Sequence, residues 1–160
     1  MYIRGEQNVS ADLLSRTAPV TTEWCLTTKT FLDLQSWRGQ HLEVDLFASP
    51  ENAQLPLFVC PYEHPRAHAR DALTHDWNQW GQIYLFPPPK LLNTVVQKLS
   101  SYTGHGLLIA PYLPHAPWFS SVAIRSTQLR TITTGLVQTV QCVVRKDFPP
   151  SYAHLTAFNF

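Results

Sequence analysis

Asp45 is the residue with the clearest potential for chemistry, because it is an acidic residue within an apolar stretch that leads into a polar turn. Residues 44–47 are rich in β-formers and predict a short strand. Residues 49–52 predict a turn, since they hold a proline that fixes φ and an asparagine that tolerates left-handed geometry. Open α/β sheets bind ligands at the carboxyl ends of their strands. Asp45 is therefore either a ligand-binding carboxylate or a cap for the turn that follows it.

Metal-binding and nucleophilic patterns are weak in this chain. Its seven histidines are dispersed, and the nearest pair, His64 and His68, has Pro65 between them, which opposes a helix that would present both rings on one face. The glycines form no phosphate-binding loop. The three cysteines have neither a paired nor a zinc-type spacing, which predicts reduced, mostly buried thiols in an intracellular protein: Cys25, Cys60 and Cys142.

Aromatic residues give a second candidate surface. Trp77, Trp80 and Tyr84 lie close together in the sequence and could stack on nucleic-acid bases. Few basic residues interleave with them, and the net charge of the chain is only +1, so no strong electrostatic field would attract nucleic acid. Core packing or contact with a partner is therefore the favoured interpretation. Any nucleic-acid role must depend on a local site or on partner domains.

The elements that would position these residues alternate between strands and helices. The chain of 160 residues is long enough for one ordinary domain, and its 13 prolines predict short elements. Apolar strands are predicted at residues 83–86 and 107–110, and helices within 23–37, 90–102 and 117–125. Continuous apolar strands that alternate with helices are typical of a parallel sheet covered on both faces. The pattern therefore predicts the α/β fold class.

The last part of the chain fits this pattern least well. Residues 131–134 and 137–144 are rich in β-branched side chains and predict strands, which a proline-containing segment at 147–150 interrupts. The last ten residues have no clear period, so we expect them to fray. Residues 127–160 are accordingly expected to form an irregular or β-rich tail.

The first residues combine a strand, a glycine turn and a short helix that Asn8 can cap. The sequence Tyr-Ile-Arg-Gly-Glu-Gln-Asn-Val-Ser-Ala-Asp-Leu-Leu-Ser-Arg, residues 2–16, resembles the closing segment of the RNase H domain in retrotransposon reverse transcriptases. The resemblance implies that Asp12 corresponds to the last of the carboxylates that hold two Mg²⁺ ions in an intact RNase H domain. The other carboxylates would lie upstream, so Asp12 can be catalytic or metal-binding only if the rest of that domain is present. Residues 1–18 are expected to be a C-terminal remnant of such a domain, in a fragment of a longer protein.

A second resemblance covers residues 21–125 and depends on the order and spacing of its landmarks. They are Asp45-Leu46-Phe47-Ala48-Ser49 with Asn52, Asp71-Ala72-Leu73 with Asp76-Trp77, Tyr84-Leu85-Phe86-Pro87-Pro88, Leu107 to Pro111, and Pro117-Trp118-Phe119. This order resembles the module that follows RNase H in polyproteins of DIRS-type retrotransposons, which is itself similar to phage Dam-type adenine methyltransferases. The resemblance implies a small Rossmann-like, methyltransferase-like and mostly parallel sheet with flanking helices over residues 21–126. It also implies that Asp45, Ser49 and Asn52 lie on the cofactor side, where S-adenosylmethionine would bind.

The resemblance also identifies the positions that would do the chemistry. A Dam-type enzyme needs a loop of the form Asn/Asp-Pro-Pro-Tyr at a strand end, because its first side chain holds the amine of a flipped adenine and its aromatic ring stacks on the base. The matching positions here are Phe86, Pro87, Pro88 and Pro89. Phe86 cannot accept a hydrogen bond from the amine, and Pro89 replaces the stacking ring. Loss of such a partner lowers activity by several orders of magnitude, so the catalytic motif is predicted to be degenerate.

These resemblances predict a non-catalytic accessory fragment of a retrotransposon reverse transcriptase and RNase H polyprotein that supports nucleic-acid handling or assembly. Its expected partners are the upstream portion of that polyprotein and DNA or RNA. One alternative is an S-adenosylmethionine-dependent DNA adenine methyltransferase, and another is a decayed retroelement fragment with no activity. The chain has no apolar run of about eighteen residues and no signal-peptide pattern, so we expect no membrane contact and an intracellular location, in the cytoplasm or the nucleus.

Overall fold

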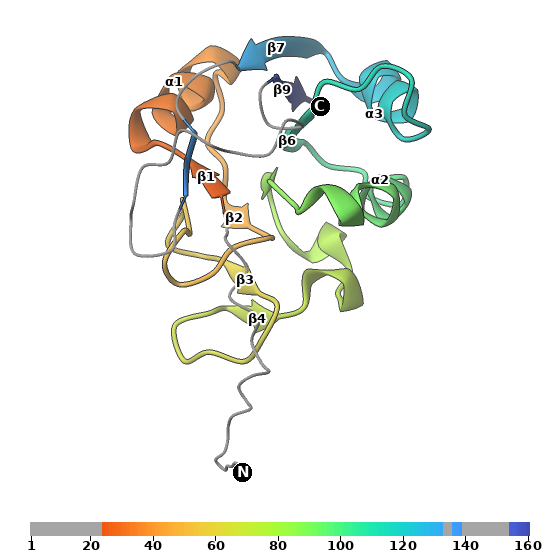
Figure 1. The fold of residues 1–160 in the computed structure, drawn as a ribbon. Helices are drawn as coiled ribbons and strands as arrows, with labels where there is room; N and C mark the ends of the chain where they lie inside the picture. Colours follow the sequence, from red (N-terminus) through yellow and green to blue (C-terminus); the bar gives the residue numbers. More distant parts are fainter. Residues whose placement is uncertain (1–23, 133–135, 139–153) are drawn as a thin grey trace.

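The computed structural model describes residues 24–132, 136–138 and 154–160, and these form a mixed α/β fold around a mostly parallel sheet (Figure 1). The strand order in the sheet is β2-β5-β6-β9-β7. Strands β2, β5 and β6 are parallel neighbours, whereas β9 runs antiparallel to both β6 and β7. The bounds of the five strands are Val44–Asp45 for β2, Ile83–Leu85 for β5, Gly106–Pro111 for β6, Gln128–Ile132 for β7 and Leu155–Asn159 for β9.

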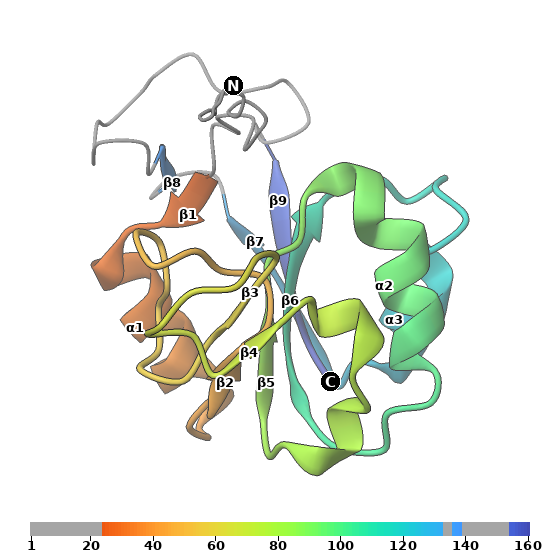
Figure 2. The same cartoon turned by 90° about the horizontal axis from the view of Figure 1, so that it is seen from below.

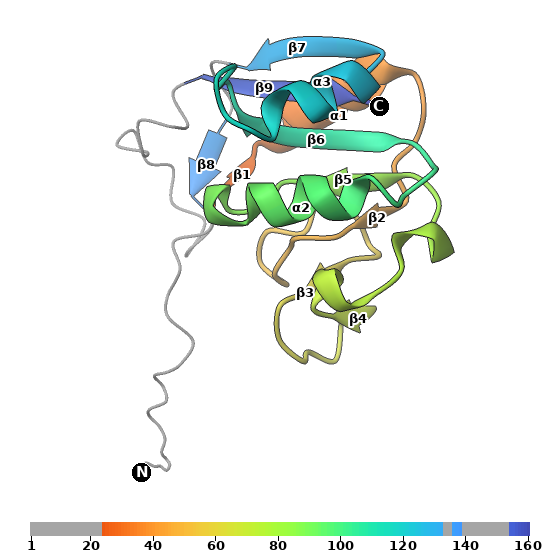
Figure 3. The ribbon, with the colours of Figure 1, turned by 90° about the vertical axis from the view of Figure 1, so that its right-hand side faces the viewer.

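Helices cover both faces of this sheet, as the sequence predicts. Helix α1 (Thr28–Arg38) lies on one face, and α2 (Leu92–Leu99) and α3 (Phe119–Arg125) lie on the other (Figures 2 and 3). The alternation of side chains along each strand supplies both cores. On β5, for example, Ile83 and Leu85 pack with the α2 and α3 side, whereas Tyr84 packs beneath α1.

Two small strand pairs extend the fold beyond the central sheet. Strand β3 (Val59–Cys60) runs parallel to β4 (Ala69–Arg70), and a parallel bridge between Asp45 and Phe58 joins this pair to β2. Strand β1 (Trp24–Leu26) pairs antiparallel with β8 (Leu136–Gln138). Three short 3₁₀ turns complete the described elements: η1 (Ala72–Thr74), η2 (Trp77–Gln79) and η3 (Pro89–Leu91).

Local signals explain most of the helix boundaries. The hydroxyl of Thr27 accepts a hydrogen bond from the Thr30 N–H and caps α1. Gly39 ends α1 in the left-handed conformation, with φ of 78°, which a glycine adopts readily. Helix α2 ends at Leu99, before the predicted limit at residue 102, where the Arg125 guanidinium donates to carbonyls of the following turn.

The end of the chain differs most from the sequence prediction. The expectation that the last ten residues fray is wrong, because β9 lies between β6 and β7 with all five of its residues buried. Such a strand shows no polar–apolar alternation, since both of its faces are covered. The sheet thus combines strands from residues 21–126 with strands from 127–160.

Residues 1–23 and 139–153, which include Asp12 and Cys142, lie outside the described part of the chain. No helix in the described ranges combines the length and apolar character that a membrane crossing requires.

Gly106 tests how closely β5 and β6 approach each other. A Cβ atom at this position would overlap the carbonyl oxygen of Ile83 and would lie 2.9 Å from the ring of Phe160. Gly106→Ala is therefore expected to lower the free energy of unfolding by about 1–3 kcal/mol, measured by urea denaturation. Gln97→Ala, on the exposed face of α2, is the matched control and should change it by less than about 0.5 kcal/mol. Equal midpoints for the two variants would contradict the predicted close approach.

Candidate functional site

A small cleft opens at the carboxyl ends of β2 and β5. It is lined by Cys25, Asp45, Phe47, Asn52, Gln54, Tyr84 and Phe86. The segment of β3 lies on one side of β2, and β5, which comes later in the chain, lies on the other side. The order of the strands therefore reverses its direction at β2. Ligands of open α/β sheets bind at such reversals, outside the carboxyl ends of the strands. The position of the cleft alone therefore makes it the leading candidate site.

Asp45 is the charged group of this cleft, and it is only 2% exposed. Its Oδ2 atom accepts a hydrogen bond of 3.0 Å from the Gln54 backbone N–H, whereas its Oδ1 atom has no hydrogen-bond partner among the described residues. Burial raises the pKa of the carboxyl to about 7, and hydrogen bonds from the backbone of Gln54 and Phe47 oppose that rise. Near neutral pH the group therefore exists both as a carboxylate and as a neutral acid.

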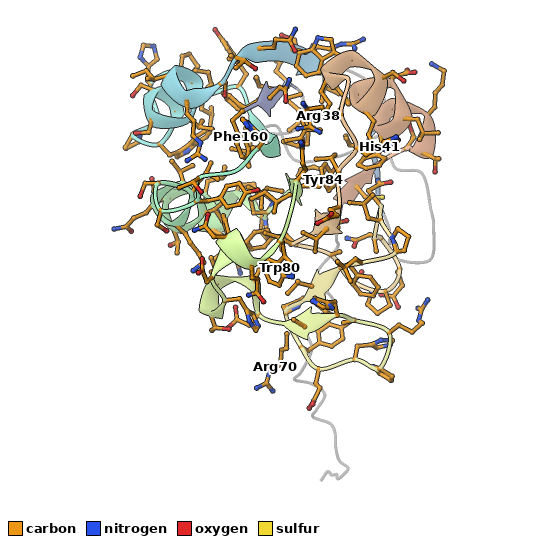
Figure 4. The ribbon with its side chains drawn as sticks, turned by 180° about the vertical axis from the view of Figure 1, so that it is seen from behind. Arg38, His41, Arg70, Trp80, Tyr84 and Phe160 are labelled. Carbon is orange, nitrogen blue, oxygen red and sulfur yellow. The ribbon has the colours of Figure 1, made fainter. Side chains whose placement is uncertain are left out.

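Tyr84 provides a second buried polar atom directly beside Asp45. The two residues are paired in register on adjacent parallel strands. The Tyr84 side chain lies in the interior (Figure 4), where its hydroxyl has no hydrogen-bond partner among the described residues. Burial first, and then the charge of Asp45, raises the pKa of this hydroxyl well above its ordinary value. Buried polar atoms are rarely unpaired, so the hydroxyl and Oδ1 of Asp45 form a donor–acceptor set available to a polar partner.

The turn after β2 holds the other two residues predicted on the cofactor side. The side-chain oxygen of Asn52 accepts a hydrogen bond of 2.6 Å from the backbone N–H of Ser49. Asn52 lines the cleft, whereas Ser49 is buried behind it, with a hydroxyl that has no partner among the described residues. The bond from Gln54 to Asp45 shows that the carboxyl also holds this turn. The structural and the ligand-binding interpretations of Asp45 are therefore compatible.

The segment Phe86-Pro87-Pro88 follows β5 and reaches the same edge of the sheet. The ring of Phe86 is 8% exposed, packs in the cluster beneath α1 and lines the cleft. Pro87 is buried, and Pro88 is exposed where η3 begins. Asp76 and Asn78, the acid and the amide that come before this segment in the chain, do not reach this edge. Both lie before β5, where Asp76 accepts a hydrogen bond from the Asn78 N–H and Asn78 accepts one from the Thr103 N–H. The end of β5 thus contributes hydrocarbon, and the acid comes from β2.

Sequence reasoning assigned Trp77, Trp80 and Tyr84 mainly to the core. Trp77 is 2% exposed and Tyr84 is 1% exposed, which confirms that interpretation for both, whereas Trp80 is partly exposed. The role of Tyr84 in the cleft was missed, together with those of Gln54 and Cys25. Alternation along β5 could have placed Tyr84 on the face that Asp45 shares, but only once β2 and β5 were known to be neighbours.

The cavity volume of the cleft is about 10 Å³, which is room for about one water molecule, and the cleft is partly open to solvent. This volume is below the range of about 300–1,000 Å³ that is usual for drug-sized ligands.

Within the described ranges, no group of three or more His, Cys, Asp or Glu side chains could hold a metal ion. Cys60 is buried, and Cys25 is half-buried. No protein-family model matches the chain, and no curated protein matches it significantly.

The buried Asp45 carboxyl predicts a distinctive pH dependence of stability. Its pKa rises from 3.8 in the unfolded chain to about 7 in the folded protein, so the folded state binds the proton more tightly between these values. Stability from this group is therefore complete below about pH 4 and is lost as the pH rises to about 7, by about 4 kcal/mol in total.

Asp45→Asn removes this ionisation and can keep the bond from Gln54. The variant is expected to be more stable than the wild type at pH 8, by a few kcal/mol, and close to it at pH 4.5. Asp33→Asn, at an exposed ion pair on α1, is the control. Urea denaturation at several pH values provides the measurement. If the wild type and Asp45→Asn showed the same pH slope, Asp45 would not be a buried titrating group.

Proposed function

We propose that the described part of the chain is a Rossmann-like, methyltransferase-derived α/β module. Two structural observations support this class. A reversed strand near the edge of an otherwise parallel sheet is common among doubly wound folds. In addition, the two sequence landmarks that matter most for methyl transfer, Asp45 and the segment 86–88, flank the same cleft at the strand reversal.

More particularly, we propose that the module is a non-catalytic accessory part of a DIRS-type retrotransposon reverse transcriptase and RNase H polyprotein, where it supports nucleic-acid handling or assembly. The segment 2–16 supports this context by its resemblance to the end of RNase H. Asp12 would then complete a Mg²⁺ site only together with carboxylates of the upstream portion, which is also the proposed partner. The volume of the cleft is too small for a whole nucleoside cofactor, which agrees with the proposed loss of methyl transfer.

The observation that carries the loss of catalysis is the ring of Phe86 in the cleft. Methyl transfer to adenine requires a polar side chain at this strand end to hold the exocyclic amine. Phe86 presents hydrocarbon there, and Pro88 and Pro89 lead into a 3₁₀ turn without an aromatic ring to stack on the base. A site that must pair a substrate N–H group and lacks its partner loses about 10⁴–10⁵ in discrimination.

A methyl-transfer assay tests this proposal. The full chain is incubated with radiolabelled S-adenosylmethionine and adenine-containing DNA, next to an active adenine methyltransferase as a positive control. We expect no incorporation above that of heat-denatured protein, and no micromolar binding of S-adenosylmethionine by calorimetric titration. Incorporation by the wild type would favour the alternative, a DNA adenine methyltransferase with an unusual site that uses the polar pair Asp45 and Tyr84.

A substitution at position 86 distinguishes a degenerate methyltransferase site from a cleft of unrelated origin. Phe86→Asn restores an amide at the strand end, and Phe86→Leu is the matched apolar control. If the cleft descends from a methyltransferase site, Phe86→Asn is expected to bind S-adenosylmethionine or adenosine more tightly than Phe86→Leu, by about tenfold for one regained hydrogen bond. Equal weak binding by the two variants would count against methyltransferase ancestry.

A further inference from the structure

A cluster of aromatic and basic side chains lies away from the cleft, on the segment between β3 and β5. It consists of the rings of His68, His75 and Trp80 together with Arg70, whose backbone oxygen contacts His75, and is called the Trp80 patch below. The rings of His68 and Trp80 have centroids 6.0 Å apart at 68°, and those of His75 and Trp80 are 5.8 Å apart at 57°. Trp80 precedes β5, so the patch lies toward the amino end of this strand, whereas the cleft lies at its carboxyl end.

The polar groups of the patch are mainly hydrogen-bond donors. His75 Nε2 lies 2.9 Å from the backbone oxygen of Arg70, so this nitrogen must carry the hydrogen. The guanidinium of Arg70 is exposed and extends away from the body of the protein (Figure 4), and it makes no hydrogen bond or ion pair with any described residue. The indole N–H of Trp80 likewise has no partner within the described part of the chain. Such a surface suits a ligand that is rich in acceptors.

Three acids lie on the same segment, and two of them are engaged. Asp71 Oδ1 accepts from the Leu73 N–H at 3.3 Å, and Asp76 Oδ1 accepts from the Asn78 N–H at 3.0 Å. Asp71 also has a left-handed backbone, with φ of 58°, directly after Arg70. Together with Glu63 these acids more than offset the positive charge of Arg66 and Arg70, three negative charges against two positive. Binding at the patch must therefore come from stacking and one or two local phosphate contacts, and not from a strong electrostatic field.

We propose that the Trp80 patch binds single-stranded nucleic acid, with a base stacked on Trp80 and a phosphate of the same strand held by Arg70. Aromatic stacking of unpaired bases tolerates any sequence and needs few cations, whereas duplex binding depends on many phosphate contacts. An acidic peptide would gain no stacking energy from the partly exposed indole of Trp80. The inference rests on the nucleic-acid role proposed above and adds the surface that performs it.

Fluorescence anisotropy with a labelled oligothymidylate of about 20 nucleotides at low salt tests the patch. Trp80→Leu is expected to weaken binding by about 5- to 150-fold, the equivalent of one lost stacking contact. Arg70→Ala is expected to weaken binding and to reduce the slope of log K against log salt by about 0.7, the value for one phosphate contact. Circular dichroism verifies the fold of Trp80→Leu, and Arg70→Ala removes a side chain that makes no hydrogen bond, ion pair or ring contact with a described residue.

Two controls remove similar groups elsewhere. Tyr112→Leu removes another exposed aromatic ring, and Lys90→Ala removes another exposed cation; both should bind within about twofold of the wild type. If Arg70→Ala and folded Trp80→Leu both bound the oligothymidylate with wild-type affinity, the proposal that the Trp80 patch binds nucleic acid would be wrong. The proposed function would not be affected by that result. Absence of binding by the wild type itself would overturn both the patch and the nucleic-acid role, whatever the methyl-transfer assay gives.

Discussion

The parallel pairing of β2 with β5 is the interaction on which the rest of the structure depends. It sets Asp45 beside Tyr84 on the face of the sheet that α1 covers. It also brings the segments after both strands to one edge, where Phe47 and Phe86 form apolar walls of the cleft. Because both faces of the sheet are covered, this short pairing is made away from water, where a lost hydrogen bond is costly. The site and the core therefore share the same contacts.

Burial determines the chemistry that this cleft can perform. Asp45 and Tyr84 each keep a polar atom without a partner among the described residues, and such atoms cost stability. A cleft that served only for packing would be more stable with apolar residues at both positions. The retained polar atoms thus fit a site with room for a small polar partner, about the size of a water molecule, and the hydrocarbon of Phe86 fits a site that no longer orients an amine for methyl transfer.

The two proposed surfaces lie toward opposite ends of β5 and use different physics. The cleft offers buried hydrogen-bonding atoms between aromatic walls, whereas the Trp80 patch offers partly exposed rings and an unpaired guanidinium. A net charge of +1 gives neither surface a strong long-range field. Nucleic acid would therefore be bound by short-range stacking at the patch, and a strand held there would not need to enter the cleft.

The sequence by itself determined the local elements. Gly39 ended a helix, and the apolar runs at 83–86 and 107–110 became buried strands, because caps, prolines and periodicity act over a few residues. The position of Asp45 at a strand end was equally readable. Only the tertiary structure decided which strands are neighbours, that Tyr84 meets Asp45, and that Leu155–Asn159 lies inside the sheet. Pairing between distant segments leaves no local period, and a strand buried on both faces looks like an aperiodic tail.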